Sequence, residues 1–244
     1  MSVILEAVAL TRRFAGLVAV DAVSFGLNAG EILGVIGPNG AGKTTLVSLI
    51  SGTLAPTSGD VLFEGRSMLN LSPYQRGRLG IGRTFQIMKP FPGLSVLDNV
   101  AIGALFGHGG SGRGLAEARE LARTQLDFVG LGAVADRRAD ELGGPGRKRL
   151  ELAKALATQP KALLCDEVMA GLNLVEIDEV IDIIRRVRDS GVSVLVIEHV
   201  IKAIRSLSDR LLVLHHGEKI AEGTPEAVLA DSRVVEAYLG RRRA

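Results

Sequence analysis

The residues with the clearest chemistry form the run GPNGAGKTT, which fits the pattern G-x-x-x-x-G-K-[ST] and follows the apolar stretch Ile32–Ile36. Glycine has no Cβ atom, so successive backbone N–H groups of such a run can approach phosphate oxygens closely. A helix that begins near Lys43 would point its positive end at the same anion. Lys43 would then reach the β- and γ-phosphates of a nucleotide, and the Thr44 hydroxyl would bind Mg²⁺. The predicted nucleotide-binding residues of this run are Gly37, Pro38, Asn39, Gly40, Ala41, Gly42, Lys43, Thr44 and Thr45.

Two consecutive acids end a second apolar stretch, ALLCDE, at Ala162–Glu167. An aspartate at a strand end beside a phosphate loop can hold Mg²⁺ through water, which assigns that role to Asp166. The next acid, Glu167, would lie where a carboxylate orients and polarises an attacking water, so we predict that it is the general base. His199 follows a third apolar stretch, Val192–Glu198, on the side where parallel sheets bind ligands. No N-K-x-D segment that would read guanine occurs, so a GTPase is disfavoured.

Each of these motifs also has a plainer interpretation. The glycine-rich run could be a turn with an exposed lysine, the two acids an ordinary solvated strand end, and His199 a structural histidine. The order and spacing of the three motifs favour the functional interpretation. By contrast, Cys165 lies within an apolar stretch and is predicted to be buried and inert. The pair His215 and His216 precedes a glycine turn, and a metal-binding role for it is disfavoured.

Short apolar stretches punctuated by glycine alternate with segments of helical periodicity. Stretches that are apolar on both faces are typical of strands covered by helices on both sides. The clearest helical segment is Leu174–Asp189, and near the start Leu5–Leu10 and Val20–Leu27 flank a Gly16 turn, which predicts an antiparallel strand pair. The alternation predicts an α/β fold with a mainly parallel sheet. The other candidate strands are Ile32–Ile36, Val61–Phe63, Ala162–Cys165, Val192–Ile197 and Leu211–Leu214.

A segment in the middle of the chain breaks this alternation. Residues Met88–Gly114 are rich in glycine and proline and are predicted to form loops. Leu115–Gly130 and Lys148–Ala157 then show helical periodicity. We therefore predict a single domain with a helical insert. The predicted division is residues 1–86 and 158–244 for the core and residues 87–157 for the insert.

Composition narrows the protein class. The chain has 244 residues, of which 47% are hydrophobic, and this is enough for a large packed core. Its net charge of +2 gives no strong electrostatic field that would attract nucleic acid. A single cysteine cannot form an intramolecular disulfide, which favours a reducing compartment. The mean hydropathy of +0.27 is high, but apolar stretches such as Val192–Ile197, with six residues before a charge, are well short of a membrane span. A cytoplasmic globular protein is expected.

These motifs, in this order and over nearly the whole chain, resemble the nucleotide-binding subunits of ABC transporters. The resemblance implies a P-loop NTPase (RecA-like) core with an N-terminal antiparallel β subdomain and an inserted helical subdomain, and it implies hydrolysis of ATP with Mg²⁺. It also implies that Phe14 stacks on the adenine ring, that Ala170–Asn173 contact a partner subunit and that His199 senses the γ-phosphate. Gln86, in RTFQ, matches the glutamine that contacts Mg²⁺ and the attacking water. The implied catalytic residues are Lys43, Gln86, Glu167 and His199, and the implied magnesium ligands are Thr44, Gln86 and Asp166.

Three segments, AGLN, VIEH and EGTPEAVLADSRVVEAYLG, look most like the ATPase subunits of branched-chain amino acid importers. The resemblance implies transmembrane permease subunits, a second ATP-binding subunit (identical or different) and a solute-binding protein as partners, with no nucleic acid. It places the protein on the inner face of the cell membrane.

One segment departs from the family pattern, because the signature LSGGQ is replaced by LGGPG at Leu142–Gly146. Gly143 replaces the serine whose hydroxyl would bind the γ-phosphate held by the opposite subunit, and Pro145 has no N–H to donate. Arg147 or Lys148 could compensate. The residues of this altered partner contact are Gly143, Gly144, Pro145 and Gly146.

Other functional classes fit the sequence less well. The altered signature keeps open a regulatory subunit that binds ATP but hydrolyses little. A soluble ABC ATPase of translation or DNA repair would carry two cassettes or a long coiled coil, and the separation of Lys43 from Asp166 leaves no room for one. A small-molecule phosphotransferase is disfavoured because no acceptor-binding lid is recognisable.

Overall fold

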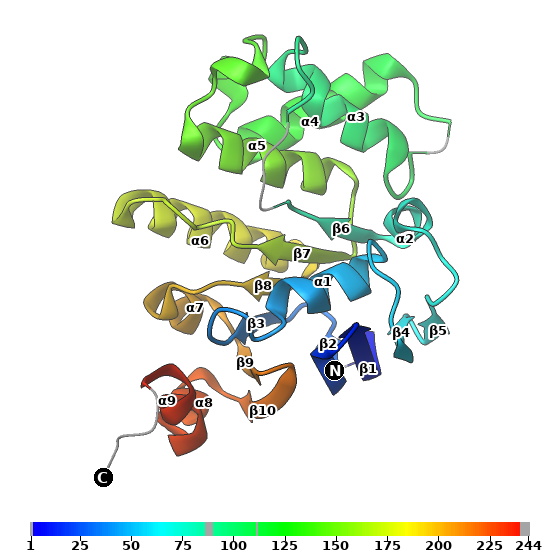
Figure 1. Ribbon diagram of the computed structural model, residues 1–244. Coiled ribbons are helices and arrows are strands. Elements are labelled where there is room, and N and C mark those ends of the chain that lie inside the picture. The colour runs from blue at the N-terminus through cyan, green and yellow to red at the C-terminus, as the bar shows by residue number, and fades with distance from the viewer. Residues whose placement is uncertain (1, 86–89, 111, 240–244) are drawn as a thin grey trace.

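The computed structural model describes residues 2–85, 90–110 and 112–239. Its strands form two sheets (Figure 1). The larger has the order β10-β9-β3-β8-β7-β6, and each neighbouring pair is parallel except β9 and β10. The smaller is antiparallel, with the order β2-β1-β4-β5. The strands are β1 (Val3–Phe14), β2 (Leu17–Asn28), β3 (Ile32–Ile36), β4 (Ser58–Phe63), β5 (Arg66–Ser67), β6 (Ile81–Arg83), β7 (Ala162–Asp166), β8 (Ser193–Ile197), β9 (Arg210–His215) and β10 (Glu218–Gly223).

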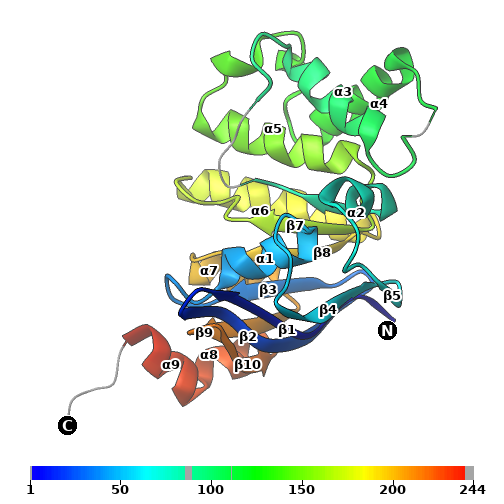
Figure 2. The same ribbon diagram turned by 45° about the vertical axis from the view of Figure 1, so that its right-hand side comes forward.

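The helices cover both faces and both edges of the larger sheet. Figures 1 and 2 show α3, α4 and α5 together beyond the β6 edge, and α8 and α9 beside the β10 edge. No helix within the described ranges is both long and apolar enough to cross a membrane. The helices are α1 (Lys43–Ser51), α2 (Pro73–Leu79), α3 (Val96–Phe106), α4 (Leu115–Phe128), α5 (Gly144–Ala157), α6 (Leu174–Asp189), α7 (Ile201–Leu207), α8 (Pro225–Ala230) and α9 (Ser232–Leu239), with 3₁₀ turns at Gly132–Val134 and Ala139–Glu141.

The larger sheet separates two hydrophobic cores, which explains its unbroken apolar strands. In β7, Leu163 and Cys165 pack in the core shared with α5 and α6, whereas Ala162 and Leu164 pack in the core shared with α1 and the antiparallel sheet. All five residues of this strand are buried. Burial stabilises each large apolar side chain by about 1.5–3 kcal/mol relative to exposure, so both faces of the strand contribute.

The α/β architecture with a mainly parallel sheet and an N-terminal antiparallel strand pair is confirmed. The helix predicted at Leu174–Asp189 has those bounds, and its start is fixed by a capping box in which Asn173 and Glu176 exchange hydrogen bonds with each other's backbone N–H. The division of the chain at residues 87 and 157 stays a prediction, although α3, α4 and α5 do pack against one another.

The loop predicted at Met88–Gly114 was wrong over part of its length, because α3 occupies Val96–Phe106. Residues 88, 89 and 111 lie outside the described part. Ser95 caps the helix by accepting a hydrogen bond from the Asp98 N–H at 3.0 Å. The flanking PFPG and GHGGSGRG runs dominate the composition, yet eleven of the residues between them form about three turns of mostly apolar helix.

Two smaller predictions also need correction. Val61–Phe63 is a strand, but it belongs to β4 of the antiparallel sheet, where Phe63 pairs with Leu5 of β1. The helix predicted to start at Lys148 starts at Gly144 instead. Proline is favoured in the first turn of a helix, so the proline that disrupts the signature also begins α5 earlier.

Candidate functional site

The phosphate-loop run connects β3 to α1, which begins at Lys43 as expected. Two of its glycines are required by close packing. A Cβ atom on Gly37, whose φ is 156°, would lie 2.2 Å from the carbonyl oxygen of Leu214, and one on Gly42, at φ 100°, would lie 2.3 Å from that of Ala19. The loop is therefore packed between β9 and β2 so tightly that only glycine fits at these positions.

The Lys43 ammonium lies inside this loop. Its Nζ donates hydrogen bonds to the carbonyl oxygens of Gly37 at 2.7 Å and Pro38 at 3.0 Å. Burial lowers the pKa of Lys43, and the nearby carboxylates of Glu167 and Asp166 oppose this effect. The ammonium is thus held by neutral oxygen atoms that an anionic oxygen could replace.

A cavity of about 520 Å³ opens above the loop. This volume is within the usual range for small-molecule sites. Phe14 lies on its wall and is 41% exposed as a residue, and the guanidinium carbon of Arg12 is 4.6 Å from the centroid of its ring. Phe14 is therefore accessible to a planar ligand. The lining residues are Phe14, Leu17, Val18, Ala19, Asn39, Gly40, Ala41, Gly42, Lys43, Thr44, Thr45, Glu167 and His216.

Asp166 ends β7 and is almost completely buried, at 1% exposure. Its Oδ2 accepts a hydrogen bond from Arg83 at 3.2 Å, while its Oδ1 is buried without a hydrogen-bond partner among the described residues. Burial raises the pKa of Asp166, and the Arg83 charge opposes this. A buried carboxylate oxygen with unused acceptor capacity is a ligand of the kind that Mg²⁺ prefers, and the Thr44 hydroxyl in the first turn of α1 is a further oxygen donor.

Glu167 lines the cavity and has a backbone conformation that is unusual for a residue with a side chain. Its φ is 52°, in the left-handed region. The N–H of Glu167 donates to the Ile197 carbonyl at 3.0 Å, and its own carbonyl accepts a hydrogen bond from Lys148 at 2.8 Å. These bonds connect the predicted base to β8 and to α5.

His199 and Ala170–Asn173 do not line the cavity. His199 is exposed beyond the end of β8 and is not among the residues that line the cavity. Ala170–Asn173 form an accessible turn before α6. Gln86 lies outside the described residues. The roles of these residues stay predictions.

The altered signature forms the start of α5, with Gly143 as its N-cap and no side-chain cap. The Arg147 guanidinium donates to the carbonyls of Leu142 and Asp140, at 2.8 and 2.9 Å. Lys148 donates to the carbonyl of Glu167. Both cations that could have compensated for the lost signature groups are therefore bound to carbonyl oxygens of their own chain.

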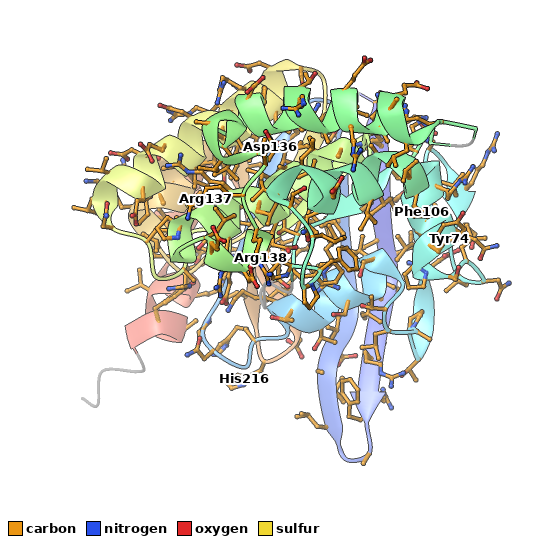
Figure 3. The ribbon with its side chains drawn as sticks, turned by 90° about the horizontal axis from the view of Figure 1, so that it is seen from above. Tyr74, Phe106, Asp136, Arg137, Arg138 and His216 are labelled. Atoms are coloured by element: carbon orange, nitrogen blue, oxygen red, sulfur yellow. The ribbon has the colours of Figure 1, made fainter. Side chains whose placement is uncertain are left out.

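Two residues at this site were missed by the sequence analysis. Arg83 joins Asp166 to the end of α1, because it also donates to the hydroxyl of Ser51 at 2.8 Å. His216, labelled in Figure 3, lies at the turn between β9 and β10 and lines the cavity. The turn is held against the loop by the Gly217 N–H, which donates to the Ala41 carbonyl at 3.1 Å. His216 reaches the cavity only through the tertiary packing of this turn, so no local pattern in the sequence indicates its position.

Sequence comparisons place the chain among transport ATPases. The profile of the ABC transporter family matches residues 20–170, and that of the branched-chain amino acid ATP-binding cassette transporter matches residues 218–244. The high-affinity branched-chain amino acid transport ATP-binding protein BraF of Pseudomonas aeruginosa is 36% identical, over 97% of this chain and 98% of that protein. The corresponding protein LivG of Escherichia coli is 36% identical, over 95% of each chain.

Solved structures agree with this grouping. An ATP-binding cassette of an ABC transporter, in its ADP conformation, has a TM-score of 0.88 and 32% identity, and the match covers 99% of this chain and all of that one. A bacterial ABC transporter cassette solved as a dimer has a TM-score of 0.82 and 25% identity, over 91% of this chain and 98% of the other.

Proposed function

The chain belongs to the ABC transporter family of ATP-hydrolysing subunits, and from that premise we propose that it powers an importer of branched-chain or related amino acids. The family profile covers more than half of the chain, and the relatives align over nearly all of it. Support for the substrate class comes from the second profile, at residues 218–244, and from the transport function named for both relatives.

The observation that carries the site assignment is that the phosphate loop and the predicted base line the same cavity. Lys43 and Thr44 lie on one wall, Glu167 lines it as well, and Phe14 provides an exposed aromatic surface. A nucleotide in this cavity would have its base beside Phe14 and its phosphates against the N-terminus of α1. The Lys43 ammonium would exchange the carbonyl oxygens of Gly37 and Pro38 for phosphate oxygens.

Hydrolysis then depends mainly on position and charge. Glu167 orients the attacking water and accepts its proton. The loop amides and Lys43 hold the phosphates and stabilise the negative charge that develops on their oxygen atoms. His199 steadies the γ-phosphate in this scheme. When bound, Mg²⁺ neutralises phosphate charge. Thr44, Gln86 and, through water, Asp166 would hold it, and the unpaired Oδ1 of Asp166 fits that role.

Transport requires partners. We propose that two transmembrane permease subunits form the path through the membrane, that a solute-binding protein delivers the amino acid, and that this chain lies on the cytoplasmic face. A second ATP-binding subunit would complete the nucleotide sites, and a related cassette has been solved as a dimer.

The two nucleotide sites of such a pair would differ. This chain contributes a complete phosphate loop to one site and the altered signature to the other. Loss of two hydrogen bonds to an anion, at about 1.5–3 kcal/mol each, would weaken the second site. We therefore propose a heterodimer in which hydrolysis at this chain's own phosphate loop dominates. Hydrolysis by the complex should fall much further with Glu167→Gln than with the equivalent change in the partner, and equal losses would contradict the asymmetry.

A regulatory subunit that binds ATP with little hydrolysis is the alternative, and the altered signature is the observation that favours it. The presence of Glu167 on the cavity wall argues against this alternative. A single-turnover measurement on the assembled complex decides between them, because a regulatory subunit would retain its ATP unhydrolysed.

Uptake by the reconstituted complex tests the proposed substrate class. The transporter is assembled in vesicles with its permeases and solute-binding protein and supplied with radiolabelled leucine, isoleucine or valine. We expect ATP-dependent uptake of these three amino acids that Lys43→Ala abolishes, with glutamate as the control solute. Uptake of glutamate but not of the branched-chain amino acids would exclude the proposed class without affecting the ATPase assignment.

A further inference from the structure

The loop between β7 and α6 holds Glu167 in a conformation that needs external support. The backbone of a residue other than glycine is strained at a φ of 52°, and such a conformation persists only where the surrounding structure fixes it. Three residues on, the Ala170 N–H donates to the Glu167 carbonyl at 3.3 Å, which closes a turn but does not anchor it to the rest of the protein. The contacts that do anchor this turn therefore determine where the predicted base lies.

One anchor is a carboxyl group that has no part in the scheme above. Glu198 follows β8 and is completely buried. Its Oε1 accepts a hydrogen bond from the N–H of Met169 at 2.7 Å, two residues after the base. Its Oε2 is buried and has no hydrogen-bond partner within the described part of the chain. Burial of a carboxyl group with an unpaired oxygen costs free energy, so packing alone does not account for a glutamate here.

A second anchor comes from α5. Lys148 donates to the Glu167 carbonyl at 2.8 Å, and its charge acts on the Glu198 carboxyl as well. The other groups that face Glu198 are the Glu167 carboxylate, the backbone N–H groups of Met169 and His199, and the buried thiol of Cys165. Burial raises the pKa of Glu198 to about 7, and the Met169 N–H and Lys148 oppose this effect.

We propose that Glu198 is a positioning residue which, together with Lys148, fixes the turn from Glu167 to Ala170 and so places the base toward the cavity. The inference rests on the proposed hydrolytic role of Glu167. Glu198 acts through Met169, and Lys148 acts through the carbonyl of the base itself. Because Lys148 belongs to α5, a shift of this helix on contact with a partner subunit would reach the base through one hydrogen bond.

The test compares three variants in the assembled transporter, with kcat for ATP hydrolysis and the Kd for ATP measured separately. Glu198→Leu removes the acceptor for Met169, whereas Glu198→Gln keeps it. The matched control is Glu151→Gln, since Glu151 is also a buried glutamate, but its carboxylate pairs with Lys154, three residues further along α5, at 2.6 Å.

We expect Glu198→Leu to lower kcat about tenfold or more while the Kd for ATP changes by less than about twofold, because a misplaced base impairs the chemical step and not binding. Glu198→Gln should retain at least about half of kcat, and the control variant should match the wild type. A kcat for Glu198→Leu equal to that of the wild type would overturn the proposal. So would an equal loss in Glu198→Gln and Glu198→Leu.

If Glu198→Leu does not fold, Lys148→Met replaces it. We expect a lower kcat at unchanged Kd, and an unchanged kcat would again overturn the inference. Absence of hydrolysis in the wild-type complex would instead refute the proposed function, so the two failures are distinguishable.

Discussion

Two of the glycine-rich helix starts in the described part of the chain differ in almost everything except their glycines. The phosphate loop precedes α1, and the altered signature precedes α5. Both N-caps are glycines, Gly42 and Gly143, without a side-chain cap. At α1 a lysine lies inside the loop and a cavity opens above it. At α5 a proline occupies the first turn, and Arg147 is bound to carbonyls of its own chain.

This difference shows that a helix N-terminus with glycines is not sufficient for phosphate binding. At α1 the loop is held between two strands, and the Lys43 ammonium is hydrogen-bonded inside it. At α5 a Cβ atom on Gly143 or Gly144 would meet nothing within 4 Å, so close packing does not require glycine there. The first site is preorganised, whereas the second depends on what a partner provides.

The largest effect should come from disabling the chemistry at the complete site. Glu167→Gln removes the base but keeps the size of the side chain, so we expect kcat for ATP hydrolysis by the complex to fall about 10²–10⁴-fold with little change in ATP affinity. Steady-state phosphate release and nucleotide titration measure the two quantities. Glu179→Gln, on the surface of α6, is the control. A loss of less than about tenfold would mean that another group acts as base.

Removal of the loop cation should have the next largest effect. Lys43→Ala leaves the amides in place but deletes a charged donor, and we expect ATP affinity to fall about 10²-fold, which corresponds to one or two charge-assisted hydrogen bonds. Lys161→Ala, which removes an exposed lysine paired with Glu64, should leave the Kd unchanged. If Lys43→Ala bound ATP as tightly as the wild type, the lysine would give the start of α1 no advantage in phosphate binding over the start of α5.

Restoration of the signature groups at the start of α5 should make this helix start more like that of α1. Gly143→Ser with Pro145→Gly restores a hydroxyl and an N–H, and we expect hydrolysis by the complex to rise about two- to tenfold. Pro225→Gly, a proline in the first turn of α8, is the control for the removal of a helix-start proline. No increase would show that this segment does not limit hydrolysis in the assembled transporter.

A smaller effect is expected at the cavity wall. Phe14→Ala removes the aromatic surface, and loss of one stacking contact worth about 0.5–1.5 kcal/mol should weaken ATP binding about two- to tenfold. Phe106→Ala removes another exposed phenylalanine, which lies at the end of α3 (Figure 3), and should have no effect. If Phe14→Ala bound ATP with the same affinity as the wild type, the nucleotide base would have to lie elsewhere than beside Phe14.

The sequence predicted the parts of the site that follow one another along the chain. The strand, loop and helix around Lys43 form a local unit, and the acids after Ala162–Cys165 end a strand whose apolar pattern is unbroken. Residues brought together only by packing were not predictable in the same way. Arg83 ends a three-residue strand, and Glu198 was noted only as the last residue of the stretch Val192–Glu198.

Errors in the fold have a similar cause. The loops predicted at Met88–Gly114 followed from an average over glycine-rich flanks, which concealed a helix with its own cap at Ser95. Val61–Phe63 has the apolar pattern of a core strand, yet its partner is β1, and a pattern of single residues does not reveal which strand will pair with it. Local signals specify an element, whereas its neighbours depend on the whole chain.

The sheet that divides the molecule gives adjacent positions independent constraints. Leu163 packs in the core shared with α5 and α6. Leu164, the next residue, packs in the core shared with α1, the helix that follows the phosphate loop. A substitution at Leu163 is therefore accommodated or resisted by the packing of α5 and α6, whereas a substitution at Leu164 disturbs the core beneath α1, the helix that begins at Lys43.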